Sequence, residues 1–79
     1  MWEVHYSREA ATYLEDNGEL ITHLFFAMEA LAESDGIPIV GNFETMQNVI
    51  YWAVQSHWVV YGRLESAKIV RIIFIKPTS

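Results

Sequence analysis

Cysteine is absent from the 79-residue chain, and this absence excludes several kinds of structure and chemistry. A disulfide framework, a cysteine-ligated zinc site and catalysis by a thiol are all ruled out. No segment reaches the roughly 18 apolar residues that cross a bilayer, and residues 1–7 lack the apolar run of a signal peptide. We therefore expect a cytoplasmic protein that has no membrane segment.

Recognised catalytic and cofactor motifs are also missing. The sequence contains no glycine-rich phosphate loop, no G-x-S-x-G elbow and no pair of histidines spaced around a glutamate for zinc. Its three histidines are scattered along the chain, so we expect neither a metal ion nor another cofactor.

Basic residues are scarce in the first half of the chain. Residues 1–44 hold nine acids and one base, Arg8, whereas residues 45–79 hold one acid and four bases. The two parts therefore carry about −8 and +3 of the formal net charge of −5. The second part either faces a polyanion or carries ordinary solubilising charges.

Large apolar side chains are plentiful by contrast. Hydrophobic residues make up 52% of the chain, including three Trp, four Tyr and four Phe. A chain of this length buries about 60% of its unfolded surface and cannot divide that area between two cores. We expect one domain over residues 1–79.

The first third of the chain predicts a strand followed by two helices. Residues 2–6 alternate apolar and polar side chains, which is typical of a half-buried strand. Ser7 can cap a helix over residues 8–15, because its hydroxyl can accept from free backbone N–H groups. Asn-Gly at 17–18 ends this helix, and apolar residues at helical spacing predict a second one over residues 19–32.

The remainder predicts a loop and three antiparallel strands. Residues 34–45 lack a period and are expected to form a loop over the sheet, followed by strands at 47–55, 57–65 and 68–76. Residues 69–75 are apolar on both faces, so the last strand should lie inside the sheet beside the first. The predicted fold is α+β in the order β-α-α-β-β-β, with two N-terminal helices packed on one face of a four-stranded, mainly antiparallel sheet.

This order resembles that of the RelE/ParE toxins of type II toxin–antitoxin systems. The similarity rests on the opening residues 2–11, the mid-chain Pro38-x-x-Gly41 and the strand segment at 57–61 with the sequence HWVVY. It covers nearly the whole chain through the order and spacing of these features.

The resemblance implies a toxin that a cognate antitoxin holds inactive. RelE-like members are ribosome-dependent endoribonucleases that cleave mRNA, and ParE-like members poison DNA gyrase. The nuclease pattern has an arginine just before the apolar run of the penultimate strand and basic residues after the last strand. Trp58 and residues 77–79 stand at those places here, so both targets stay open. The alternative is a non-catalytic protein-interaction module of the same fold.

Alternation by polarity assigns the strand residues to two faces. Those expected toward the helices are Trp2, Val4, Tyr6, Ile50, Trp52, Val54, Trp58, Val60, Leu64, Val70, Ile72 and Phe74. Those expected on the opposite face are Glu3, His5, Tyr51, His57, Tyr61, Arg63 and Arg71.

The polar face suggests candidate residues for RNA cleavage. Attack by a 2′-hydroxyl needs a base, an acid and a cation, and the candidates for these roles are Arg63, Arg71 and His57. The candidates for RNA binding by stacking or charge are Tyr51, Tyr61, Lys68 and Lys76. Structural alternatives are an Arg71–Glu3 ion pair, tyrosines that merely favour strands, and histidines that are plain polar strand residues.

Phe25 and Phe26 follow one another in the second predicted helix, so the aromatic arc is wider than one core-facing stripe can hide. At least one ring should be partly exposed. Such apolar surface indicates binding of an antitoxin segment or a homo-oligomer contact.

Overall fold

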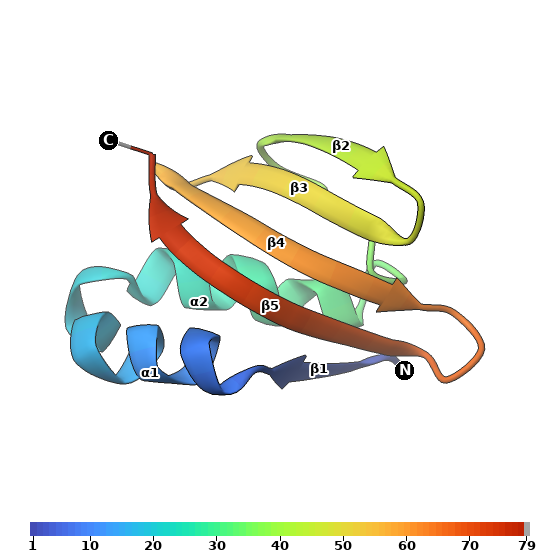
Figure 1. The fold of residues 1–79 in the computed structure, drawn as a ribbon, viewed down its shortest axis with the longest axis horizontal. Helices are drawn as coiled ribbons and strands as arrows, with labels where there is room; N and C mark the ends of the chain where they lie inside the picture. Colours follow the sequence, from blue (N-terminus) through green and yellow to red (C-terminus); the bar gives the residue numbers. More distant parts are fainter. Residues whose placement is uncertain (79) are drawn as a thin grey trace.

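Five strands form one mixed sheet in the computed structural model, which describes residues 1–78 (Figure 1). The strand order is β1-β5-β4-β3-β2, with β1 parallel to β5 and the other neighbours antiparallel. The elements in chain order are β1 (Glu3–Tyr6), α1 (Arg8–Asn17), η1 (Gly18–Leu20), α2 (Thr22–Glu29), η2 (Ala30–Ala32), β2 (Asn42–Met46), β3 (Val49–Val54), β4 (His57–Leu64) and β5 (Ile69–Pro77).

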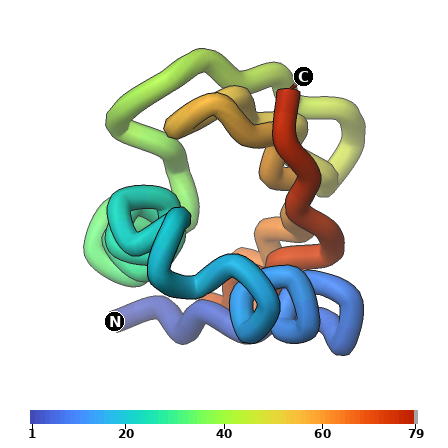
Figure 2. The backbone as a smooth tube through the Cα atoms, turned by 90° about the vertical axis from the view of Figure 1, so that its left-hand side faces the viewer, coloured from blue at the N-terminus to red at the C-terminus, as the bar shows by residue number. Residues whose placement is uncertain are grey.

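The predicted α+β class and the position of the last strand are confirmed. β5 lies between β1 and β4, as the apolar residues on both of its faces predict. Figure 2 shows the sheet curving around the core, with the two helices on one side of it. Residues from both helices and from one face of the sheet form a single buried cluster.

The expected number of strands was wrong, because β2 lies within the segment predicted as a loop. It pairs with β3 along its whole length, from Asn42 opposite Ala53 to Met46 opposite Val49. All five of its residues are exposed, since β2 is an edge strand and the helices do not cover it. Because none of its side chains is buried, its sequence carries no regular apolar alternation.

The first helix follows its capping signal. The Ser7 hydroxyl accepts from the Ala10 N–H at 3.1 Å, which confirms the predicted N-cap, and α1 continues to Asn17, two residues beyond its expected end. The second helix is shorter than predicted. α2 ends at Glu29, and the residues before and after it form the short 3-10 turns η1 and η2.

The phase of β4 is opposite to the one that polarity predicted. Val59 and Tyr61 are fully buried, whereas Trp58 and Leu64 are exposed. The Tyr61 hydroxyl donates to the Gly36 carbonyl at 2.7 Å, so this ring is buried with its polar end satisfied. Trp58, Val60 and Leu64 were therefore assigned to the wrong face.

A β-bulge also changes which residues of β5 point into the core. The register between β4 and β5 shifts at Val60/Tyr61, which leaves Ile73 as an extra residue in β5. Ile72 and Ile75 consequently both point into the core, and Phe74 lies opposite Val60 on the outer face. Phe74 was expected inside because strict alternation cannot reveal an inserted residue.

Candidate functional site

His57 lies on the helical side of the sheet, where it joins β4 to α1. Its Nδ1 lies 2.8 Å from the Gln55 carbonyl oxygen, and its Nε2 lies 2.9 Å from the Tyr13 hydroxyl. A carbonyl only accepts, so Nδ1 donates to Gln55, and in the neutral ring Nε2 accepts from the Tyr13 hydroxyl. The placement of His57 on the outer face was wrong, and its ring has a structural role here.

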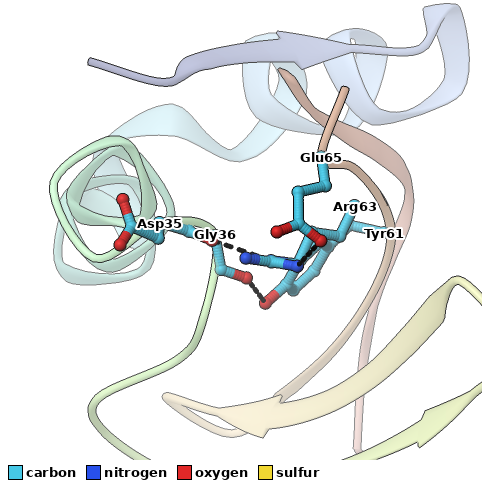
Figure 3. Close-up of polar contacts among 5 residues, drawn as sticks. All are labelled: Asp35, Gly36, Tyr61, Arg63 and Glu65. Carbon is cyan, nitrogen blue, oxygen red and sulfur yellow. Dashed lines mark hydrogen bonds and ion pairs between the residues drawn. The ribbon is translucent and has the colours of Figure 1, made fainter. Parts of the chain in front are cut away.

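Arg63 also lies on the helical side, where its side chain reaches the turn at Asp35 and Gly36 (Figure 3). Its Nε donates to the Asp35 carbonyl at 2.7 Å, and its Nη1 lies 3.4 Å from a Glu65 carboxylate oxygen. Its guanidinium carbon lies 4.7 Å from the centre of the Trp2 ring. The outer-face prediction for Arg63 is wrong because this residue shares the inward phase of Tyr61.

Tyr61 cannot act as a base-stacking residue, because its ring is 0% exposed and packs edge-on against Trp52. Together with Arg63 it holds the turn at Asp35 and Gly36 against the sheet (Figure 3). Burial raises the pKa of the Tyr61 hydroxyl well above its ordinary value of 10.0, and the nearby Arg63 charge offsets part of that rise. Because Tyr61 is buried, the free energy of unfolding should change with pH in the alkaline range.

We expect the free energy of unfolding to fall as the pH rises above about 10. Unfolded tyrosine loses its proton there while folded Tyr61 keeps it, so the stabilisation is complete below that pH and is lost above it. Tyr61→Phe should show a smaller decline between pH 8 and pH 11 in urea unfolding, and Tyr51→Phe, at an exposed tyrosine, should decline like wild type. An equal decline in all three proteins would contradict this assignment.

The outer face of the sheet keeps only part of the predicted RNA site. Arg71 is exposed there opposite His5, and Lys76 lies opposite Trp58. Glu3 bonds to His5 at 2.9 Å, and the proposed Arg71–Glu3 ion pair is not formed. Lys68 is exposed in the turn before β5. The three proposed catalytic residues thus lie on two different faces of the sheet.

Trp58 and Phe74 are the aromatic residues of the outer face that polarity placed on the helical side. With Tyr51 they give β3, β4 and β5 an aromatic surface, and Tyr51 and Trp58 are each 40% exposed. A shallow hollow of about 410 Å³ lies over these strands. It is lined by Glu44, Met46, Tyr51, Trp58, Val60, Phe74 and Lys76.

A second apolar surface lies beside α2 and is called the α2 groove. Phe26 is 63% exposed, and Phe25, at 38%, stacks on Tyr6 with 6.4 Å between ring centres. Partial exposure of at least one ring is therefore confirmed. The groove has a volume of about 290 Å³ and is lined by His23, Phe26, Ala27, Ala30, Leu31, Ser34, Ile39, Val40, Trp52 and Gln55.

The segments that form the α2 groove carry acidic residues and neither lysine nor arginine. Residues 9–62 contain eight acids and no lysine or arginine. The Tyr6 hydroxyl donates to the Glu29 carboxylate, and burial followed by this acidic neighbour raises the Tyr6 pKa. Among residues 1–78, no acid lines the groove itself, so a ligand that approaches it meets mainly apolar side chains, on segments whose charged residues are acids.

Comparisons with protein-family models, with curated proteins and with solved structures find no match. The RelE/ParE resemblance stays a prediction from the order of elements and sequence features. Over residues 1–78, no helix is long and apolar enough to cross a membrane. In the same residues, no three His, Asp or Glu side chains gather in a way that could hold a metal ion.

Proposed function

We propose that this chain is a non-catalytic protein-interaction module with a RelE/ParE-like order of elements. Its α2 groove would bind an apolar, basic segment of a partner protein. The observation that carries the proposal is the exposed run of apolar side chains at Phe26, Ile39 and Val40. Large apolar side chains that share one groove mark a binding surface.

The charge distribution favours a basic partner. Because residues 9–62 carry only acidic charge, a segment with lysine or arginine beside its apolar residues would be attracted to the groove. A helix with apolar residues at i, i+4 and i+7 would fit this description. In a toxin–antitoxin pair, that partner would be the cognate antitoxin.

The dispersal of the proposed catalytic residues argues for binding rather than RNA cleavage. Cleavage needs a proton acceptor and a cation near one phosphate. His57 and Arg63 lie on the helical side of the sheet and are bonded to Tyr13 and Asp35, whereas Arg71 lies on the outer face. No step of RNA cleavage follows from this arrangement.

A toxin that acts on translation or on DNA gyrase is the second candidate. It is favoured by the two consecutive helices, which match the order of elements in the resemblance, and by β1 pairing with β5, which the apolar last strand led us to expect. Such a toxin should arrest growth when it is expressed alone, whereas an interaction module should not. Arrest with mRNA cleavage indicates a nuclease, and arrest without cleavage indicates a gyrase-type toxin.

We expect Arg71→Ala to be the informative variant in this growth assay. Arg71 is exposed on the outer face, so its loss should remove phosphate binding without unfolding the protein. Arg63→Ala would also break the contact with Asp35 and could abolish arrest by unfolding. If wild type arrests growth, the interaction-module proposal fails. Persistent arrest by folded Arg71→Ala would exclude a role for this arginine.

A toxin gene normally lies beside the gene of its antitoxin, so the product of the neighbouring gene is the partner to test. Phe26→Ser should weaken the complex with that protein about tenfold or more, because an exposed aromatic anchor is lost. Leu20→Ser is the matched control, since Leu20 is exposed but does not line the α2 groove. Isothermal titration at low and high salt measures both affinities. Equal affinities for the two variants, or no complex with wild type, would contradict the proposal.

A further inference from the structure

The outer face of the sheet is too apolar for a surface that stays in water. An antiparallel sheet with one solvated face normally alternates apolar and polar residues, so that the outward side chains are polar. Here the outward residues of the central strands include Tyr51, Trp58, Val60 and Phe74. We infer that two copies of this chain bind to one another through their outer faces, with β2 to β5 of each copy in the interface.

The register of the strands makes this face complementary to itself. One row across the sheet runs Glu44, Tyr51, Val60, Phe74 from β2 to β5. The next row runs Asn42, Ala53, Trp58, Lys76. On the two middle strands, each row therefore places a larger residue beside a smaller one, Tyr51 beside Val60 and Trp58 beside Ala53.

A twofold axis that runs along the strands, between β3 and β4, brings these residues together. It exchanges β3 with β4 while keeping each row in place. The Trp58 side chain of one copy then lies over Ala53 of the second copy, and Tyr51 lies over Val60. Large side chains meet small ones twice, which is what a packed interface between two sheets needs.

The same axis pairs opposite charges at the rim. It exchanges β2 with β5, so Glu44 of one copy lies over Phe74 of the second and one row from its Lys76. A row is about 7 Å along the strand, a distance that the two long side chains can span. Edge-to-edge pairing of two β2 strands about their middle residue would instead place Glu44 against Glu44. Charge therefore favours the face-to-face arrangement.

The interface is small, which sets the expected affinity. Four strands about 4.8 Å apart, with about five residues each, give a face of roughly 14 by 17 Å. Two such faces give about 480 Å² in projection, which is below the roughly 1,200 Å² of stable specific interfaces, so we expect a weak dimer with a Kd on the order of 100 micromolar. RNA is a poorer fit, because Arg71 and Lys76 are balanced by Glu3 and Glu44 on the same face.

Sedimentation equilibrium of the full chain tests the inference. Wild type should dimerise, and Trp58→Ser should weaken the dimer about tenfold or more. Glu44→Lys and Lys76→Glu should each weaken it, whereas the double variant should return close to wild type. Phe26→Ser, at the α2 groove, should leave it unchanged.

Several results would overturn the inference. They are a wild type that is monomeric up to 1 mM, a dimer that Trp58→Ser leaves intact, or a double charge variant that does not recover. The charged positions are exposed, so these variants should fold, which circular dichroism verifies. If the chain stays monomeric and binds a single-stranded RNA oligonucleotide through Trp58, the ligand of the outer face is a nucleic acid and not a second copy of the chain. Because Phe26 is outside this face, the dimer and the partner-binding function fail independently.

Discussion

Trp52→Ala should lower the free energy of unfolding by about 3–5 kcal/mol. Trp52 is 1% exposed and lies at the centre of the buried cluster, edge-on to Tyr61 with 6.1 Å between ring centres. Its indole N–H also donates to the Val40 carbonyl at 2.7 Å, which holds the segment before β2 against the sheet. The substitution removes both the packing and this attachment.

Urea unfolding monitored by circular dichroism measures the loss, with Trp58→Ala as the matched control. Both tryptophans lie on adjacent strands, but Trp58 is on the outer face, so its removal should cost less than half as much. A loss of about 3–5 kcal/mol approaches the whole stability of a small domain, so a second variant is needed in case Trp52→Ala does not fold. Trp52→Phe then separates the effects, since it keeps an aromatic ring and loses the bond to Val40, at about 1–2 kcal/mol. Equal costs at Trp52 and Trp58 would contradict the assignment of faces.

In β4, the pattern of polar and apolar residues does not predict which side chains face outward. Residues 58–60 are all apolar and give no alternation. The prediction of which residues face outward therefore depended on the polar groups of His57, Tyr61 and Arg63. Each of these polar groups instead has a partner on the helical side, at Tyr13, Gly36 and Asp35 respectively. These partners are far away in the sequence, so alternation alone could not reveal them.

The elements with strong local signals were predictable. Ser7 caps α1, the apolar faces of residues 69–75 place β5 inside the sheet, and consecutive phenylalanines produce exposed rings. β2 was not predictable, because pairing at a sheet edge depends on the backbone and leaves all its side chains in water. The bulge in β5 was missed for a similar reason, since an inserted residue is a property of the pairing.

The candidate site was predictable only in part. Burying an arginine within an apolar strand costs stability unless its guanidinium has polar partners or serves a function. Arg63 has such partners, the Asp35 carbonyl and the Glu65 carboxylate. The sequence could not distinguish these two outcomes, because the turn at Asp35 approaches the sheet only in the folded chain. Arg71 has no such contact and remains available on the outer face.

Gly41→Ala should lower the free energy of unfolding by about 2–4 kcal/mol, because both the backbone and the space at this position require glycine. Gly41 has a φ of +76°, where other residues are strained, and an added Cβ would lie 2.3 Å from the Ala53 carbonyl oxygen. It would also lie 3.1 Å from the Trp52 indole nitrogen. The new methyl group therefore pushes directly against β3 at the point where β2 begins.

Gly18→Ala is the control for the general effect of replacing glycine. Gly18 has helical φ and ψ of −48° and −44°, and an added Cβ would meet nothing within 4 Å. Alanine there should raise the free energy of unfolding by about 0.4–1 kcal/mol, since it restricts the unfolded chain. Urea unfolding of both variants should thus give opposite signs. Hydrogen exchange of Gly41→Ala should show the loss of protection concentrated in β2 and the facing residues of β3. Because β2 carries Glu44, the proposed dimer should weaken with it, and a Gly41→Ala protein with intact β2 protection would show that this close approach does not hold the edge strand.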